Sequence, residues 1–280
     1  MRLPRGVRVL GAGLLLGVPA CLGVGATSNT APLVGPHLVL FVGNSLTYTN
    51  DLPRTLADLA ASGGDTLTTG AVALPNFALI DHALGGSNAL DVIRRSHWEY
   101  VVLQQGPTWP GLCLDTLVLA TRLLDEHIRA AGARTAVMMT WPSLADSAGF
   151  NSVLYSYRTA ADTVGALFLP AGEAWRTAWR ADAGLTLYGP DLYHPSPLGT
   201  LLAALVIYER LTGHDARALP AVAVVAGQRL DVSEATVRLL QSAAHESNLQ
   251  FQDASQALAP PARQPWPAGS SGAGRAAITC

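Results

Sequence analysis

Short apolar segments alternate along this chain with longer segments in which apolar residues recur at helical spacing. The pattern predicts strands at residues 37–43, 66–73, 100–104, 134–140 and 166–170. It predicts helices at residues 51–61, 79–95, 114–131, 152–164, 174–180, 197–211 and 232–246. Because alternating strands and helices form parallel sheets with crossover helices, we expect an α/β fold. The expected architecture is a three-layer α/β/α sandwich around a parallel sheet of about five strands.

The loops that follow the predicted strands carry the polar and aromatic residues of interest. In open parallel sheets, ligands bind beyond the carboxyl ends of the strands. We therefore expect the functional residues in the loops after Gly43, Ala73, Gln104, Thr140 and Pro170.

A serine follows the first predicted strand in the run Gly43-Asn44-Ser45-Leu46-Thr47. A glycine there permits a tight turn, which would present Ser45 at the sheet edge. The run is not the G-x-S-x-G elbow of α/β-hydrolases, because Thr47 stands at the last glycine position. A serine after a strand also commonly caps a helix, so Ser45 alone does not establish a nucleophile.

An acid and a base lie three residues apart in Asp191-Leu192-Tyr193-His194-Pro195. On a turn, the carboxylate of Asp191 can accept a hydrogen bond from His194 and leave the other ring nitrogen to deprotonate a serine. A serine hydroxyl needs such a base to act as a nucleophile. By itself the D-x-x-H pattern is also compatible with two unrelated surface side chains.

The two blocks together resemble the SGNH/GDSL-like hydrolase superfamily, over about residues 37–212. The resemblance implies a flavodoxin-like sandwich with Ser45 as nucleophile and Asp191 and His194 as its partners. It also implies an oxyanion hole formed by the backbone N–H of Ser45, by Asn76 and by Gln104. The run Val101-Val102-Leu103-Gln104 is similar to a bacterial subgroup with glutamine in place of the usual asparagine, and Asn76 stands near the family's usual glycine.

Four further residues are candidate substrate contacts: Gln105, Trp109, Trp141 and His82. Gln105 is also an alternative oxyanion donor to Gln104. Each of the four has a purely structural alternative, because strand-end amides, helix histidines and loop tryptophans are often buried and hydrogen-bonded.

Composition excludes several other classes of protein. All 18 basic residues are arginine, which rules out a P-loop lysine, a Schiff-base lysine and a lysine general base. The formal net charge of −2 gives no sign of a nucleic-acid binder. The seven histidines form no recognisable metal-binding spacing, and we expect neither a metal nor another cofactor.

The chain begins with three arginines, a short apolar run and small residues, which predicts a signal peptide over residues 1–26. A second reading has cleavage before Cys21 and a lipid anchor on that residue, which would attach the protein to a membrane. Both predict a secreted or periplasmic protein with a hydrolase domain at residues 35–250. Residues 253–280, rich in Ala, Pro, Gly and Ser, read as a disordered tail. Cys113 and Cys280 could pair, but the sequence favours two unpaired thiols.

Two functions fit these observations. The leading hypothesis is an exported serine esterase that hydrolyses small acyl or acetyl esters, including esters on carbohydrate, through an acyl-enzyme. The altered oxyanion positions favour the alternative, an inactive SGNH-fold protein that binds glycan or cell-envelope material. A Ser45–His194 separation far outside hydrogen-bonding reach would favour binding over catalysis.

Overall fold

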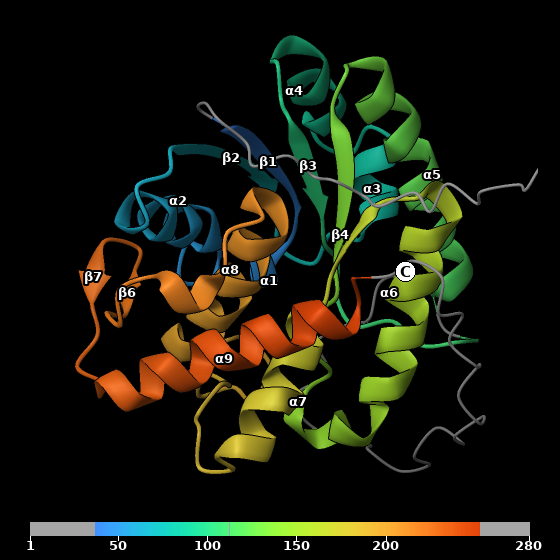
Figure 1. Cartoon of the computed structure of the whole chain (residues 1–280). Coiled ribbons are helices and arrows are strands. Elements are labelled where there is room, and N and C mark those ends of the chain that lie inside the picture. Colours follow the sequence, from blue (N-terminus) through green and yellow to red (C-terminus); the bar gives the residue numbers. More distant parts are fainter. Residues whose placement is uncertain (1–36, 112, 253–280) are drawn as a thin grey trace, which may run out of the picture. The chain divides into compact units, whose positions relative to one another are not determined.

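The computed structural model describes residues 37–111 and 113–252. Its centre is a parallel sheet of five strands in the order β2-β1-β3-β4-β5 (Figure 1). The strands are β1 (His37–Gly43), β2 (Leu67–Ala73), β3 (Tyr100–Leu103), β4 (Arg134–Met138) and β5 (Leu167–Leu169). The middle segments of β1 and β3 are fully buried, as expected for strands covered on both faces.

The described α-helices follow the predicted positions, except that α1 was not predicted and that one predicted helix is divided into α3 and α4. They are α1 (Ser45–Tyr48), α2 (Leu52–Ser62), α3 (Leu79–Ala83), α4 (Ala89–Arg95), α5 (Leu114–Ala130), α6 (Phe150–Val164), α7 (Ala171–Ala181), α8 (Pro197–Thr212) and α9 (Glu234–Gln250). Two 3-10 helices, η1 (Leu144–Gly149) and η2 (Ala216–Ala218), and a small antiparallel pair, β6 (Val224–Val225) and β7 (Gln228–Arg229), complete the described elements.

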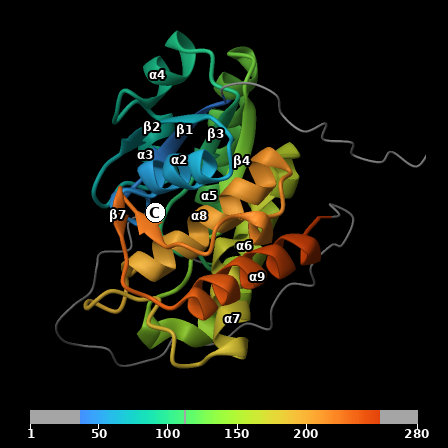
Figure 2. The same ribbon diagram turned by 60° about the vertical axis from the view of Figure 1, so that its left-hand side comes forward.

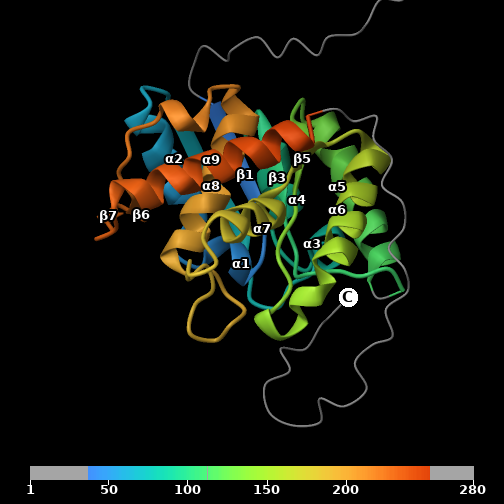
Figure 3. The same ribbon diagram turned by 60° about the horizontal axis from the view of Figure 1, so that its bottom comes forward.

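Helices cover both faces of the sheet. The helices α2 and α8 lie on one face, and α3, α5 and α6 lie on the other, as two further views show (Figures 2 and 3). The chain passes from β1 outward to β2 and then back across the sheet to β3, β4 and β5. Because crossovers between parallel strands are right-handed, this change of direction places α2 opposite α3, α5 and α6. The predicted α/β/α sandwich is confirmed.

One predicted helix is wrong in its extent. The segment 79–95 forms two short helices, because the chain turns at Gly85 and Gly86. Gly85 has a φ of +84°, which favours glycine, and a Cβ on Gly86 would lie 2.8 Å from the carbonyl oxygen of Asp81.

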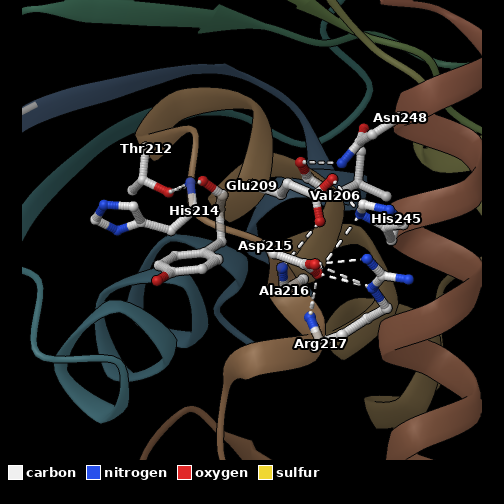
Figure 4. Close-up of polar contacts among 10 residues, drawn as sticks. Val206, Glu209, Thr212, His214, Asp215, Ala216, Arg217, His245 and Asn248 are labelled. Atoms are coloured by element: carbon white, nitrogen blue, oxygen red, sulfur yellow. Dashed lines mark hydrogen bonds and ion pairs between the residues drawn. The ribbon is translucent and has the colours of Figure 1, made fainter. Parts of the chain in front are cut away.

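Polar contacts fix α9 to α8. His245 on α9 is 3.0 Å from the carboxylate of Glu209 on α8, and Asn248 donates to the carbonyl of Val206 (Figure 4). The same carboxylate accepts the backbone N–H of Ala216 at 2.9 Å. These contacts tie the last described helix to the layer that packs on the sheet.

Several predictions concern the ends of the chain. The signal segment 1–26, the anchor at Cys21 and the tail 253–280 lie outside the described residues. Within the described part, no helix combines the length and the apolar character needed to cross a membrane.

Cys113 is disulfide-bonded, so the expectation of an unpaired thiol there is wrong.

Candidate active site

The loop after β1 places Ser45 at the first position of α1. Asn44 caps this helix, because its side-chain oxygen accepts the N–H of Leu46 at 3.1 Å. Gly43 is closely surrounded: a Cβ there would lie 2.5 Å from the side-chain oxygen of Gln104 and 2.7 Å from the hydroxyl of Thr47. The turn therefore requires glycine, and it leaves Ser45 half-buried at the carboxyl edge of the sheet.

The side chain of Gln104 holds this loop in place through hydrogen bonds. Its side-chain oxygen accepts the N–H of Asn44 at 3.1 Å and the hydroxyl of Thr47 at 2.7 Å. Its amide nitrogen donates to the side-chain oxygen of Asn44 at 3.0 Å, and the side chain is fully buried. The expectation that Gln104 donates directly to an oxyanion is therefore wrong, because its amide is enclosed and engaged with the nucleophile loop.

The acid and the base lie on a tight hairpin between α7 and α8. Tyr188 and Pro195 form a β-bridge, and the N–H of Gly189 donates to the carbonyl of His194 at 2.7 Å. One carboxylate oxygen of Asp191 accepts the backbone N–H groups of Tyr193 and His194 at 3.1 and 3.0 Å. These bonds orient the Asp191 carboxylate before it meets the imidazole.

Ser45, His194 and Asp191 form a continuous hydrogen-bonded chain. The Nδ1 atom of His194 lies 2.5 Å from the second carboxylate oxygen of Asp191, and Nε2 lies 2.8 Å from the hydroxyl oxygen of Ser45. Because the carboxylate can only accept, Nδ1 carries the proton, and Nε2 accepts the hydrogen bond from the serine hydroxyl. This is the geometry that a serine nucleophile and its general base require.

The environment keeps the carboxyl of Asp191 ionised. Burial acts to raise its pKa, but the hydrogen bonds from the His194 ring and from two backbone N–H groups outweigh that effect. The net result is a pKa below the ordinary value of 3.8. Asp191 can therefore stabilise a protonated His194 during a proton transfer.

The loop after β2 lies against the nucleophile loop. The N–H of Leu74 donates to the carbonyl of Gly43 at 3.1 Å, and the side-chain amide of Asn44 donates to the carbonyl of Phe77 at 2.9 Å. Between them, Asn76 is exposed and has a φ of +61°, a conformation that asparagine tolerates better than most residues. The predicted role of the Asn76 N–H in an oxyanion hole stays a prediction.

Two of the expected substrate contacts, Gln105 and Trp141, are packing residues instead. Gln105 is buried, accepts the N–H of Leu79 and donates to Thr108. Trp141 is 1% exposed, stacks on Trp175 at 3.8 Å between ring centroids and donates to the carbonyl of Tyr193. These positions follow buried strands, and the helices and the hairpin close over them, so the expectation of direct substrate contact is wrong.

His82 is also fully buried. Its Nε2 atom lies 2.9 Å from the carbonyl oxygen of Gly43, and Nδ1 lies 2.7 Å from the hydroxyl of Ser87. His82 therefore supports the nucleophile loop rather than a substrate. Trp109 is partly exposed and packs near Gly149, and its role as a substrate contact stays a prediction.

One group of side chains elsewhere has the composition of a metal site. The nearest ligand atoms of Glu209, Asp215 and His245 all lie within 4.8 Å of one another (Figure 4). Hydrogen bonds from Arg217 lower the pKa of Asp215 to about 2, and this arginine would repel a cation. Histidine spacing could not reveal the group, because its one histidine, His245, lies 36 residues from Glu209 in the sequence. The contacts support a structural anchor for α9.

Comparisons with known proteins agree with this fold. The sequence matches no family model and no curated protein. Among solved structures, a DUF4886 family protein from Bacteroides uniformis is similar with a TM-score of 0.64 and 18% identity, over 78% of this chain and 96% of the other. A protein from Slackia heliotrinireducens, assigned to the SGNH hydrolases, is similar with a TM-score of 0.53 and 26% identity, over 63% of this chain and 100% of the other.

The fold and these neighbours define a hydrolase-type α/β protein with a serine at the carboxyl edge of its first strand. This chain is similar in fold to the Slackia heliotrinireducens protein that is assigned to the SGNH hydrolases.

Proposed function

We propose that the protein is an exported serine esterase that hydrolyses esters of small acids. The observation that carries this proposal is the chain of hydrogen bonds from Ser45 through His194 to Asp191, with distances of 2.8 and 2.5 Å. The proposed export depends on the signal-like composition of residues 1–26.

In the proposed mechanism, the hydroxyl oxygen of Ser45 attacks the ester carbonyl while Nε2 of His194 takes the hydroxyl proton. The negative charge that develops on the carbonyl oxygen would be stabilised by the backbone N–H of Ser45, which as the first residue of α1 has no acceptor within its helix. The N–H of Asn76 is the proposed second donor.

Collapse of the tetrahedral intermediate expels the alcohol, which receives its proton from His194, and leaves an acyl group on Ser45. Water then attacks the acyl-enzyme, again with His194 as the base, and releases the acid. Asp191 holds the imidazole in the required tautomer and stabilises its protonated form in both halves of the reaction.

The alternative, a binding protein without catalysis, fits the geometry less well. It predicted Ser45 and His194 outside hydrogen-bonding reach, whereas their side chains are 2.8 Å apart. One observation favours this alternative: Gln104 is fully buried, so one expected oxyanion donor is lost.

Covalent labelling tests the proposed nucleophile. We expect a phosphonate ester that mimics the tetrahedral intermediate to modify Ser45 stoichiometrically, as read by peptide mass spectrometry. The variant His194→Ala should lose the label, because the serine loses its base, whereas Ser62→Ala on the exposed end of α2 should keep it. Equal labelling of the parent and of His194→Ala would contradict the proposal.

A further inference from the structure

A large cavity lies directly beside the Asp191–His194 pair. It has a volume of about 1170 Å³, which exceeds the roughly 300–1,000 Å³ typical of small-molecule sites. The wall next to the catalytic pair includes His194 and Asp191, and the remaining lining comes mainly from residues 183–197 and from η1. We call it the apolar pocket, because its lining includes Trp179, Leu187 and Tyr188.

The polar atoms of the Trp179 and Tyr188 side chains are already hydrogen-bonded within the protein. The indole N–H of Trp179 donates to the carbonyl of Leu185 at 2.9 Å, and the hydroxyl of Tyr188 donates to the carbonyl of Pro142 at 2.6 Å. The two rings stack with centroids 5.7 Å apart, which fixes them relative to each other. The wall is therefore preformed and offers hydrocarbon rather than hydrogen-bonding groups to a ligand.

Two exposed leucines form the rim of the apolar pocket. Leu144 on η1 and Leu192 on the hairpin are 43% and 51% exposed, and the N–H of Leu144 donates to the carbonyl of Leu192 at 2.9 Å. Neighbouring exposed leucines beside an apolar cavity indicate a surface that a hydrophobic ligand covers.

The position of the apolar pocket relative to the reacting atoms decides which part of an ester it can hold. The leaving oxygen of an ester must approach Nε2 of His194 to receive its proton, whereas the carbonyl oxygen must point toward the N–H of Ser45. The lining contains His194, but it contains neither Ser45 nor any residue of the loops at 74–77 and 104–109. A group that extends from the leaving oxygen therefore has the direct path into the cavity.

We infer, building on the proposed esterase function, that the apolar pocket binds the alcohol part of the substrate and that this alcohol is an extended hydrocarbon. The preferred substrates are then short-chain esters of long alcohols rather than acetylated sugars. Because each buried methylene adds favourable transfer free energy, kcat/KM should rise about two- to fourfold per methylene of the alcohol, up to the length that fills the cavity.

The test compares two ester series with matched variants. Acetates of ethanol, butanol, hexanol and octanol vary the alcohol, and ethyl esters of the corresponding acids vary the acid. Ser147→Trp places a bulky ring at an exposed position that lines the apolar pocket, and Ala145→Trp places the same ring on η1 at an exposed position outside the lining. An acetylated methyl glucoside is the polar comparison.

We expect kcat/KM to rise with alcohol length in the parent and in Ala145→Trp, and to lose most of this rise in Ser147→Trp. Three results would overturn the inference and leave the esterase proposal intact. They are a kcat/KM that rises with the length of the acid instead, a kcat/KM that does not change with either length, and a higher kcat/KM for the acetylated sugar.

If no ester is hydrolysed, the esterase proposal fails, and the binding of an apolar ligand then tests the apolar pocket separately. Saturable binding of 1-octanol in calorimetry, weakened in Ser147→Trp and unchanged in Ala145→Trp, would still support an apolar ligand site. Absence of binding to the parent would overturn it.

Discussion

Gln104 shows how a buried amide can serve a site that it does not touch. Its oxygen holds the backbone of Asn44 and the hydroxyl of Thr47, the two residues that flank the Ser45-Leu46 pair. The amide nitrogen returns to the side chain of Asn44, which in turn caps α1 and contacts the loop after β2. One side chain therefore fixes the position of the nucleophile, and we regard Gln104 as a positioning residue.

Substitution of Gln104 separates this role from direct oxyanion binding. Gln104→Leu has a similar volume but leaves buried polar partners unpaired, so the free energy of unfolding should fall by about 1–3 kcal/mol. The displaced Ser45 should lower kcat/KM by about 10²-fold. Urea unfolding and ester hydrolysis measure both effects, with Gln228→Leu on the exposed β7 as control. A loss of kcat with unchanged stability would instead identify a direct oxyanion donor.

At the scale of elements, three loops at one sheet edge bring the site together. The loop after β1 supplies Ser45, the hairpin before α8 supplies Asp191 and His194, and the loop after β2 carries Asn76, whose part in the site stays a prediction. The hairpin is held by its own backbone bonds and by η1, through the bond between Leu144 and Leu192. His194 therefore lies on a short hairpin that backbone hydrogen bonds hold in place, rather than on an open loop.

The anchor between α8 and α9 should contribute to stability without affecting catalysis. His245→Ala removes a partner of the Glu209 carboxylate, whose side chain is 10% exposed. Loss of this partner should lower the free energy of unfolding by about 1–3 kcal/mol, because a buried carboxylate then lacks a hydrogen bond. Thermal or urea unfolding measures the change, and His97→Ala, at an exposed position, is the control. A stability equal to that of the parent would show that the contact contributes nothing measurable.

The sequence was sufficient for the sheet and the long helices, because those depend on local apolar periodicity. Two short motifs, one after the first strand and one before α8, led to the prediction of Ser45, Asp191 and His194. The sequence did not predict those features of the site that depend on contacts between residues distant in the sequence. The residues around Gln104 in the sequence do not show whether its amide donates to an oxyanion or holds Asn44 by hydrogen bonds, since both roles need an amide at a strand end. The apolar pocket was missed because its lining combines η1 with residues 183–197, and α1 was missed because four residues are too short for a periodic pattern.

At the scale of the whole molecule, His82 couples stability to pH. Burial lowers its pKa below the ordinary 6.5, even though the Gly43 carbonyl and Asp81 favour the protonated form. In acid the unfolded chain therefore binds a proton that the folded protein excludes at this site. Its stabilising contribution is fully present above about pH 6.5 and is lost as the pH falls toward the lower folded value.

The free energy of unfolding should consequently rise with pH between about 5 and 7, and this rise should be shallower in His82→Gln, which cannot titrate. Urea unfolding at three pH values in that interval measures both slopes. His97→Gln, an exposed histidine, should keep the slope of the parent. An identical slope in His82→Gln would show that His82 does not carry this part of the pH dependence.

The proposed mechanism depends on Ser45 as the nucleophile, and the most direct measurement is the hydrolysis of p-nitrophenyl acetate by the purified parent and by Ser45→Ala. We expect turnover by the parent and a loss of about 10⁴-fold or more in kcat in the variant, with unchanged unfolding, because no other group replaces the attacking oxygen. Turnover by the parent with an equal rate in Ser45→Ala would contradict the account.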